Sequence, residues 1–343
     1  MTSVGSSDDH ARQLADVLIC ADYRGHHSHG ISRLSVYVED IATCSCAAKG
    51  EPKILKRKGA TAWVDGQNLL GPVVGNYCMK LAIDIAKEVG IGWVVAKNSN
   101  HFGTCGWYAQ QAVKSGVLGM VFTNTSPCVF PTRSAEKTLG SNPICMAAPG
   151  NSQPFFLDMA ASTVAYGKIE LANDSGVDQI PETWGNDCEG RVTIDPKSVL
   201  SGGGLQPLGG QEETGGYKGT GLCMMVEILC GILGGAAFGK NIRRWRTNEE
   251  NANLGHCFVA IDPDCFAPDF TGRLQQFLRE TRESKPLSED NPVIVPGDRE
   301  RAHMRMCDDM GGLVYEKIEL EILERLARRC NVPSPVNIDE NPS

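Results

Sequence analysis

Short apolar runs that alternate with helical patterns constrain the fold of this chain more than any other feature of its sequence. Residues 92–96 (GWVVA) form one such run, and the polar segment 97–103, a helical pattern at 108–113 and a second apolar run at 117–122 follow it. Runs of this length are typical of buried strands, and strands that alternate with helices indicate an α/β protein. Further strands are expected at residues 61–64, 144–148, 155–157 and 257–261.

Amphipathic spacing predicts the helices. The pattern at residues 77–89 is the strongest, and Gly90 ends it, as a glycine beyond the last turn commonly does. Other helices are expected at residues 10–21, 34–41, 164–171, 221–238, 271–283, 300–308 and 314–329. The most apolar stretch, 219–239, contains Glu227 and several glycines, so we interpret it as a buried core helix and not as a membrane span.

The remaining segments show little periodicity. Residues 50–71 are expected to be irregular apart from the short strand, and residues 174–216, which are rich in glycine and polar residues, are expected to be a connector. The tail at 333–343 is expected to be disordered. At roughly 150 residues per domain, a chain of 343 residues suggests about two domains.

Charge and cysteine content exclude several classes of protein. The chain has 33 Lys+Arg against 41 Asp+Glu and a net charge of -8, which argues against a nucleic-acid binder and against binding to an acidic membrane surface. Its first ten residues lack the basic and apolar regions of a signal peptide. The 14 cysteines are scattered without a Cys-x-x-Cys pair, so we expect reduced thiols and a cytoplasmic protein.

Three histidines in four residues form the first candidate site, His26-His27-Ser28-His29. A metal site is one interpretation, but no nearby cysteine or acidic residue completes a ligand set, so we predict no metal. A solvated turn is another. The third is an anion pocket, because Arg24 and Arg33 flank the cluster and Tyr37 follows one helical turn later.

His101 is the most informative single residue, because it follows a buried strand and precedes a helix. Ligands of open α/β sheets gather at the carboxyl ends of strands. A nearby helix N-terminus also disfavours the imidazolium, which would keep the ring neutral and able to accept a proton. The alternative is a polar loop histidine without a chemical role.

Three other polar positions have both a structural and a functional interpretation. The run 123–127 (TNTSP) is a turn or a hydrogen-bonding lip for a ligand. Asp158 caps the next helix or binds a ribose hydroxyl. Lys218 lies beside glycines where a helix begins, which suits an anionic group as well as an ordinary loop.

The familiar nucleotide-binding and hydrolase motifs are missing. No Gly-x-Gly-x-x-Gly follows a strand, so the Rossmann fingerprint is absent. Residues 234–240 imitate a phosphate-binding loop, but Asn241 replaces the required Ser or Thr and the segment ends a helix. The Gly-x-Ser-x-Gly motif of serine hydrolases is absent too.

Taken together, these segments resemble one family, the type-2 malate/L-lactate dehydrogenases, which also contains ureidoglycolate and sulfolactate dehydrogenases and a piperideine-2-carboxylate reductase. The clearest stretches are ADYRGHHSHGISRLSVY, NSNHFGTCGWYA and LDMAASTVAYGKIELA. Matching segments run in order through nearly the whole chain, at residues 21–37, 98–109, 123–131, 139–150, 157–172, 180–196, 215–239, 253–262 and 295–300.

The resemblance implies an α/β fold that is not Rossmann: a mixed-sheet cofactor domain packed on helical segments from both chain ends, assembled as a homodimer. We therefore expect a helical, substrate-side domain at residues 1–115 together with 285–332, and an NAD(P)-binding domain at 116–284. It implies reversible NAD(P)-dependent oxidation of a 2-hydroxy acid. We take (S)-malate and oxaloacetate as the leading pair and NAD as the cofactor, with NADP possible.

The same resemblance assigns site residues. His101 takes the position of the catalytic acid/base. His29 is also placed among the catalytic residues, on the substrate side, where it assists in clamping the substrate carboxylate. Ser28, Arg33 and Tyr37 take substrate-side positions. The cofactor-contact positions are Thr125, Asp158, Met159, Ala160 and Lys218.

Some positions depart from the family pattern. Arg133 stands near the expected cofactor pocket where a glycine is usual, and would favour NADP if it reaches the adenosine ribose. Ala252 replaces a substrate-binding arginine found in some members, which speaks against ureidoglycolate. The family usually has one more helix before residues 10–21.

Three alternatives stay open. The substrate could be lactate, sulfolactate, another 2-oxo acid or a cyclic imine. The chain could be an inactive binding or structural descendant. A metal-dependent hydrolase built on the histidines at 26–29 is the least favoured.

Overall fold

The centre of the protein is a mixed sheet of seven strands. The computed structural model describes residues 1–244, 247 and 250–334, so most of the tail expected to be disordered lies outside the described residues. The strand order is β1-β2-β3-β10-β4-β5-β6; β2 and β3 are parallel, and the other neighbouring pairs are antiparallel. The strands are β1 (Lys53–Lys58), β2 (Thr61–Asp65), β3 (Ile91–Ser99), β4 (Leu118–Thr123), β5 (Ile144–Ala148), β6 (Phe155–Met159) and β10 (Leu254–Ile261). This sheet confirms the predicted α/β class and its mixed, non-Rossmann character.

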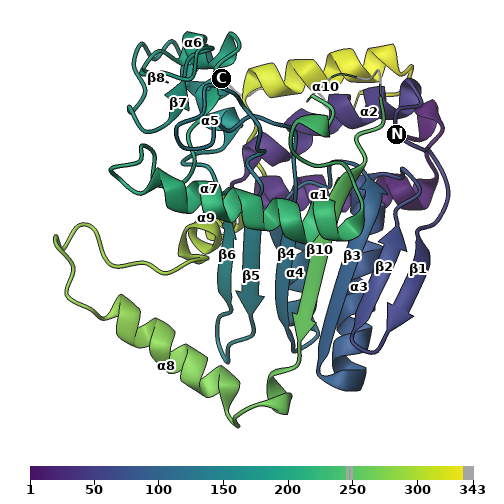
Figure 1. Cartoon of the computed structure of the whole chain (residues 1–343), viewed down its shortest axis with the longest axis vertical. Coiled ribbons are helices and arrows are strands. Elements are labelled where there is room, and N and C mark those ends of the chain that lie inside the picture. Colours follow the sequence, from purple (N-terminus) through teal and green to yellow (C-terminus); the bar gives the residue numbers. More distant parts are fainter. Residues whose placement is uncertain (245–246, 248–249, 335–343) are drawn as a thin grey trace.

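Helices cover both faces of the sheet (Figure 1). On one face lie α3 and α4, and α7 crosses the other face in front of the strands. The helices are α1 (Asp8–Tyr23), α2 (Leu34–Ala42), α3 (Gly71–Val89), α4 (Cys105–Lys114), α5 (Tyr166–Asp174), α6 (Pro196–Leu200), α7 (Gly216–Glu227), α8 (Phe270–Arg282), α9 (Asp298–Met310) and α10 (Lys317–Arg329). None of the helices in the described residues is both long enough and apolar enough to cross a membrane.

Side chains of the central strands point alternately to the two faces of the sheet and so contribute to two hydrophobic cores. In β3, Val94 packs toward α3 and α4, whereas Val95 packs toward α7. In β10, Phe258 likewise belongs to the core under α3 and α4, and Val259 to the core under α7. Successive side chains of a strand point to opposite faces, so a strand covered on both faces is apolar at every position. This is why these strands stand out in the sequence as continuous apolar runs.

Helices from the N-terminal and C-terminal parts of the chain pack together beside the sheet. Tyr23 at the end of α1 donates to the carboxylate of Asp308 in α9 at 2.8 Å, and Arg329 in α10 pairs with Glu39 in α2 at 3.0 Å. The helical segments from both ends therefore pack together, as the predicted fold class requires. The predicted domain boundary between residues 115 and 116 falls between α4 and β4, and the large sheet continues across it.

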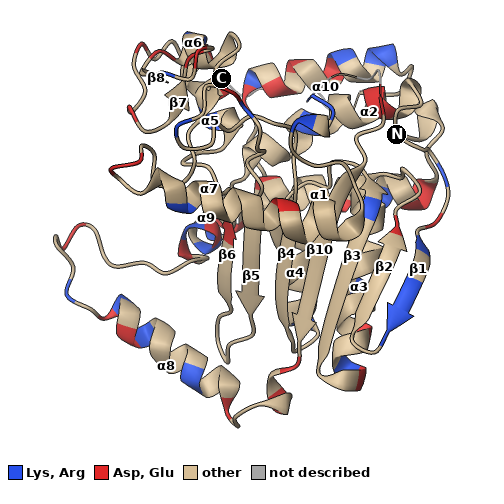
Figure 2. Cartoon of the chain, in the orientation of Figure 1, with Lys and Arg blue, Asp and Glu red and all other residues tan. Residues whose placement is uncertain are grey.

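Two segments that were expected to be irregular contain strands. Within 50–71, β1 has the sequence KILKRK, and its Lys and Arg residues are blue in Figure 2. Every residue of β1 is exposed. An edge strand that is exposed throughout shows no buried alternation, and its charges protect the open edge from pairing with other chains. The expected connector 174–216 contains α6 and a small sheet of β8 (Val192–Thr193), β7 (Gly185–Asn186) and β9 (Gly204–Leu205). Strands of two residues are too short to carry a periodic pattern.

The helix predicted within 219–239 is confirmed, but the prediction that it is buried holds for one side only. The α7 helix begins at Gly216 and continues through a π-helical segment, Ile228–Ile232. Val226 and Cys230 pack on the sheet, but an opposite apolar face is exposed: Met224 (52 %), Ile228 (52 %), Ile232 (54 %) and Leu233 (59 %). The helix has only one covered side, and its composition alone could not reveal that.

Candidate active site

His101 and Tyr37 form the centre of the candidate site. His101 lies in the loop between β3 and α4, and Tyr37 lies on α2 with its side chain buried. The Tyr37 Oη is 2.6 Å from His101 Nδ1. Burial lowers the pKa of His101 well below its usual value, with smaller contributions from the charges of His29 and Arg33. The ring is therefore neutral near pH 7, as a proton acceptor must be, and Tyr37 fixes its orientation.

His29 and its neighbours face the same ring. The rings of His29 and His101 are stacked, with centroids 5.8 Å apart. Ser28 Oγ lies 2.9 Å from His29 Nδ1, and Arg33 Nε donates to the Ser28 carbonyl at 2.5 Å. Burial, and then the Arg33 charge, lower the pKa of His29 to about 4. The structure thus brings together all five residues expected on the catalytic and substrate side.

Arg33 has a partner that the sequence did not reveal. Its Nη2 lies 3.0 Å from Oε2 of Glu170, which α5 presents to it. Glycine at position 167 permits this approach, because a Cβ there would lie 2.7 Å from the Cβ of Ser28. The guanidinium of Arg33 thus already binds one carboxylate, that of Glu170, in this structure.

The histidines at positions 26–29 do not converge. His26 lies 3.9 Å from Glu300, and the His27 ring packs edge-on against His303 with centroids 5.3 Å apart. His29 turns instead toward His101. Within the described ranges, no three His, Cys, Asp or Glu side chains are grouped so that they could hold a metal ion.

His256 in β10 packs against Phe102, the residue after His101, and was not singled out from the sequence. It is fully buried, its ring stacks on Phe102 at 4.4 Å, and its two ring nitrogens lie 2.7 Å from Thr123 Oγ1 and 2.8 Å from Ser99 Oγ. Burial lowers its pKa to about 3. A histidine inside an otherwise apolar strand was the signal that could have found it.

The Thr125 loop is held by a buried acid. Thr125 N donates to Asn142 Oδ1 at 3.0 Å, and Asn142 Nδ2 donates to Glu227 Oε1 at 2.9 Å. The other oxygen of Glu227 accepts from Asn124 Nδ2 at 3.1 Å. A single carboxylate of α7 thereby fixes the loops after β4 and before β5, which explains a charged residue in the most apolar stretch of the chain.

Asp158, Met159 and Ala160 lie at the end of β6, where the sequence placed them. Asp158 Oδ2 accepts from the backbone N–H of Gly106 at 2.7 Å, in the first turn of α4. Burial raises its pKa to about 6 against the opposing effect of that bond. In this structure the carboxylate stabilises the N-terminus of α4, which precedes β6 in the chain, and not the next helix, which it was expected to cap.

Lys218 lies in the first turn of α7 and is exposed. Its neighbour Gly219 packs on Leu208, and Leu208 N donates to the carbonyl of Ala161 at 2.9 Å. Ala161 N in turn donates to the carbonyl of Ser141 at 2.7 Å, whose Oγ lies 3.4 Å from Thr125 Oγ1. The segments that carry the three groups of expected cofactor residues are therefore joined by direct contacts.

Two positions that depart from the family pattern have local explanations. Arg133 has a φ of 68° and binds Glu212 through Nε and Nη2, both at 2.7 Å, on the surface. Ala252 is 5 % exposed and packs with Ile242 and Leu254.

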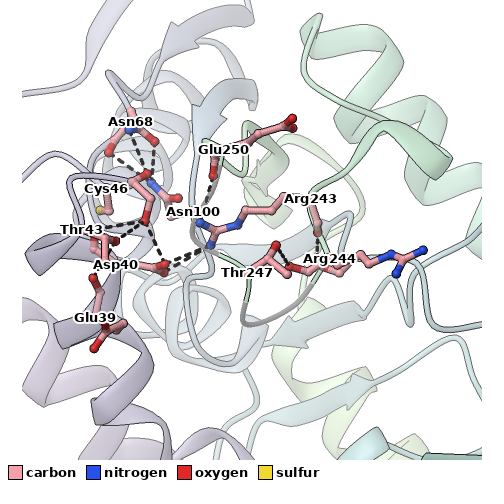
Figure 3. A network of polar contacts seen from close by, with 12 residues as sticks. Glu39, Asp40, Thr43, Cys46, Asn68, Asn100, Arg243, Arg244, Thr247 and Glu250 are labelled. Atoms are coloured by element: carbon pink, nitrogen blue, oxygen red, sulfur yellow. Dashed lines mark hydrogen bonds and ion pairs between the residues drawn. The ribbon is translucent and has the colours of Figure 1, made fainter. Parts of the chain in front are cut away.

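A buried ion pair connects the two sides of the site (Figure 3). Arg243 Nη2 lies 3.2 Å from Oδ1 of Asp40, which is on α2 one turn beyond Tyr37, and both side chains are at most 7 % exposed. The carbonyl of Arg243 accepts from Ser126 Oγ at 2.7 Å, next to Thr125. Arg243 thus links the helix that carries Tyr37 to the loop after β4.

The chain thus combines a mixed, non-Rossmann sheet with a histidine of lowered pKa beside an arginine. The family model for malate/L-lactate dehydrogenase matches residues 1–323, and the chain belongs to that family.

Similar proteins carry related names. The chain is 40 % identical to the malate dehydrogenase of Pyrococcus abyssi (97 % of this chain, 91 % of that protein) and 36 % identical to the malate/(S)-sulfolactate dehydrogenase of Methanothermus fervidus (97 % and 94 %). The crystal structure of malate dehydrogenase from Entamoeba histolytica matches with a TM-score of 0.92 at 31 % identity, over 98 % of this chain and 95 % of that one.

Proposed function

We propose that this protein catalyses the reversible oxidation of (S)-malate to oxaloacetate with NAD. The observation that carries the proposal is the neutral His101, bonded to Tyr37 and placed beside Arg33 and the loop at Ser28. The names of the similar proteins support malate and leave sulfolactate as the nearest alternative.

His101 is the acid/base in this mechanism. The neutral ring carries its proton on Nδ1, where it donates to the oxygen of Tyr37, and during oxidation the unprotonated Nε2 takes the hydroxyl proton of malate. In reduction, protonated His101 returns the proton to the developing alkoxide. Proton transfer of this kind contributes roughly 10²–10⁴-fold in rate. The lowered pKa of His101 keeps its ring neutral near pH 7, which is the form that accepts the hydroxyl proton.

Arg33 is the proposed carboxylate clamp. A guanidinium presents two parallel N–H donors that fit a carboxylate and orient the reacting carbon. Its present partner is Glu170, so the substrate carboxylate has to displace or share that ion pair. Ser28 and His29 complete the substrate side, and His29 assists His101 through its stacked ring.

The residues on the other side fit a dinucleotide. A bound nicotinamide supplies the hydride acceptor. The exposed ammonium of Lys218 lies at a helix N-terminus, which suits a phosphate, while the hydroxyl of Thr125 and the backbone at Asp158–Met159–Ala160 would hold polar groups of the cofactor. Arg133 is already paired with Glu212. A 2′-phosphate would have to compete with this carboxylate for the guanidinium, which favours NAD over NADP.

A spectrophotometric assay tests the function. Purified protein is mixed with oxaloacetate, pyruvate or sulfopyruvate, and oxidation of NADH and of NADPH is followed in parallel. We expect the fastest turnover with oxaloacetate and NADH, and a loss of orders of magnitude in His101→Ala with NADH binding retained. Faster turnover with another acid would replace malate as substrate, and NADH binding without any turnover would favour an inactive binding protein.

The proposal includes a homodimer in the cytoplasm. The exposed apolar face of α7, formed by Met224, Ile228, Ile232 and Leu233, supports a second copy as the covering partner. Free thiols at all fourteen cysteines support a reducing compartment. Sedimentation of the wild type and of Ile228→Lys tests the dimer: we expect a dimer that the lysine weakens, and a monomeric wild type would refute it.

A further inference from the structure

The turn that carries Ser28 and His29 is built around a buried carboxylate. Asp22, near the end of α1, is 1 % exposed. Its Oδ2 accepts two hydrogen bonds, one from the backbone N–H of Ile31 at 2.8 Å and one from Oη of Tyr315 at 3.0 Å. One oxygen therefore holds both the end of the turn and a residue from the far end of the chain.

The turn fits closely over this carboxylate. A Cβ at Gly30 would lie 1.7 Å from Asp22 Oδ1, so only a glycine is accommodated there. His27 Nδ1 lies 3.4 Å from the same oxygen, and His303 Nε2 lies 3.2 Å from the Asp22 carbonyl. The residues before and after Ser28 and His29 are thus both placed by Asp22.

Tyr315 lies between α9 and α10 and donates a hydrogen bond from its hydroxyl to the Asp22 carboxylate. Burial raises the pKa of Asp22, and the bonds from Ile31 and Tyr315 oppose that change. They therefore favour the ionised carboxylate, and a hydrogen bond to a buried charge is among the stronger ones. Losing the tyrosine hydroxyl would weaken the anchor on which the backbone of the turn depends.

We propose that Asp22 and Tyr315 are positioning residues that hold the 27–31 turn so that Ser28 and His29 face His101 and Arg33 is aimed at the substrate. This inference rests on the proposed function of that site. Neither residue acts on the substrate itself; each acts through the backbone of the turn. The C-terminal segment is therefore part of the apparatus that shapes the substrate pocket.

A second tyrosine offers a matched control. Tyr23 Oη donates to the Asp308 carboxylate at 2.8 and 2.9 Å and also ties α1 to the C-terminal segment. That bond lies on the surface and involves neither Asp22 nor the turn. If the tyrosines merely fasten the two chain ends together, removing either hydroxyl should have the same consequence.

The test compares Tyr315→Phe with Tyr23→Phe in the full-length protein. We expect Tyr315→Phe to raise KM for oxaloacetate on the order of threefold to tenfold, with a smaller change in kcat and an unchanged Kd for NADH. Hydrogen exchange of the peptide covering residues 26–33 should become faster. Tyr23→Phe should leave both KM and this exchange at the wild-type level.

Asp22→Asn and the double variant Asp22→Asn/Tyr315→Phe extend the test. If Tyr315 acts through Asp22, the double variant should be no worse than Asp22→Asn alone. Additive effects, or unchanged exchange at 26–33 in Tyr315→Phe, would overturn the proposal, as would equal effects of the two tyrosine variants. A wild type without turnover would refute the proposed function alone, because the exchange measurement still tests the anchor.

Discussion

Removal of the Arg243 side-chain charge should destabilise the protein in a manner that depends on pH. In Arg243→Met the apolar stem is retained while the guanidinium beside Asp40 is lost. Both side chains are almost fully buried, and the guanidinium approaches the two carboxylate oxygens at 3.2 and 3.4 Å. Breaking a buried pair by removing one partner costs about 3–5 kcal/mol. Because Ser45 Oγ still lies 3.2 Å from Asp40, we expect about 3 kcal/mol, the lower end.

The pH dependence follows from the direction of the Asp40 pKa. Burial raises this pKa, and Arg243 opposes the rise. An acid whose pKa is higher in the folded than in the unfolded state loses stability as pH rises through the folded pKa. The variant raises that pKa further, so the gap between variant and wild type should widen from acidic to neutral pH.

Urea denaturation at fixed protomer concentration measures the effect at mildly acidic and at neutral pH. The exposed pair Arg57–Glu88, at 2.7 Å, supplies the control, since Arg57→Met should cost at most about 1 kcal/mol. A loss in Arg243→Met no larger than in Arg57→Met would refute the reasoning. A gap that does not change with pH would show that Asp40 is not the group responsible.

Three further predictions concern the candidate site directly. Tyr37→Phe removes the 2.6 Å contact with His101 and should lower kcat/KM roughly tenfold to a hundredfold with NADH binding retained; a change within twofold in steady-state kinetics would contradict this. Glu170→Gln should lower KM for oxaloacetate about twofold to fivefold, because Arg33 loses its internal carboxylate; an unchanged or higher KM would show that Glu170 does not compete with substrate. His29 has a folded pKa of about 4, below its usual value, so stability should fall as pH drops from about 6.5 toward 4; His29→Gln should lessen this fall in thermal melts, and an undiminished fall would assign it to other groups.

The sequence by itself determined the class of fold, because the central strands are buried on both faces. Their continuous apolar runs predict β3, β4, β5 and β10 within a few residues. The 3.6-residue period predicts the end of α3 at Gly90, although the helix begins at Gly71, six residues before the predicted start. Both signals are local, since they depend only on neighbours along the chain. His101 was found for the same reason: a polar residue directly after a buried strand is visible without any tertiary contact.

The tertiary structure decided what each side chain faces. The contact of Arg33 with Glu170 joins residues 137 positions apart, and that of Asp22 with Tyr315 joins residues 293 apart. No periodicity reports such pairs, because they arise when separate elements pack. The exposed face of α7 and the charged edge strand β1 were misjudged for a related reason: composition records how apolar or charged a segment is, whereas burial depends on which other segments cover it.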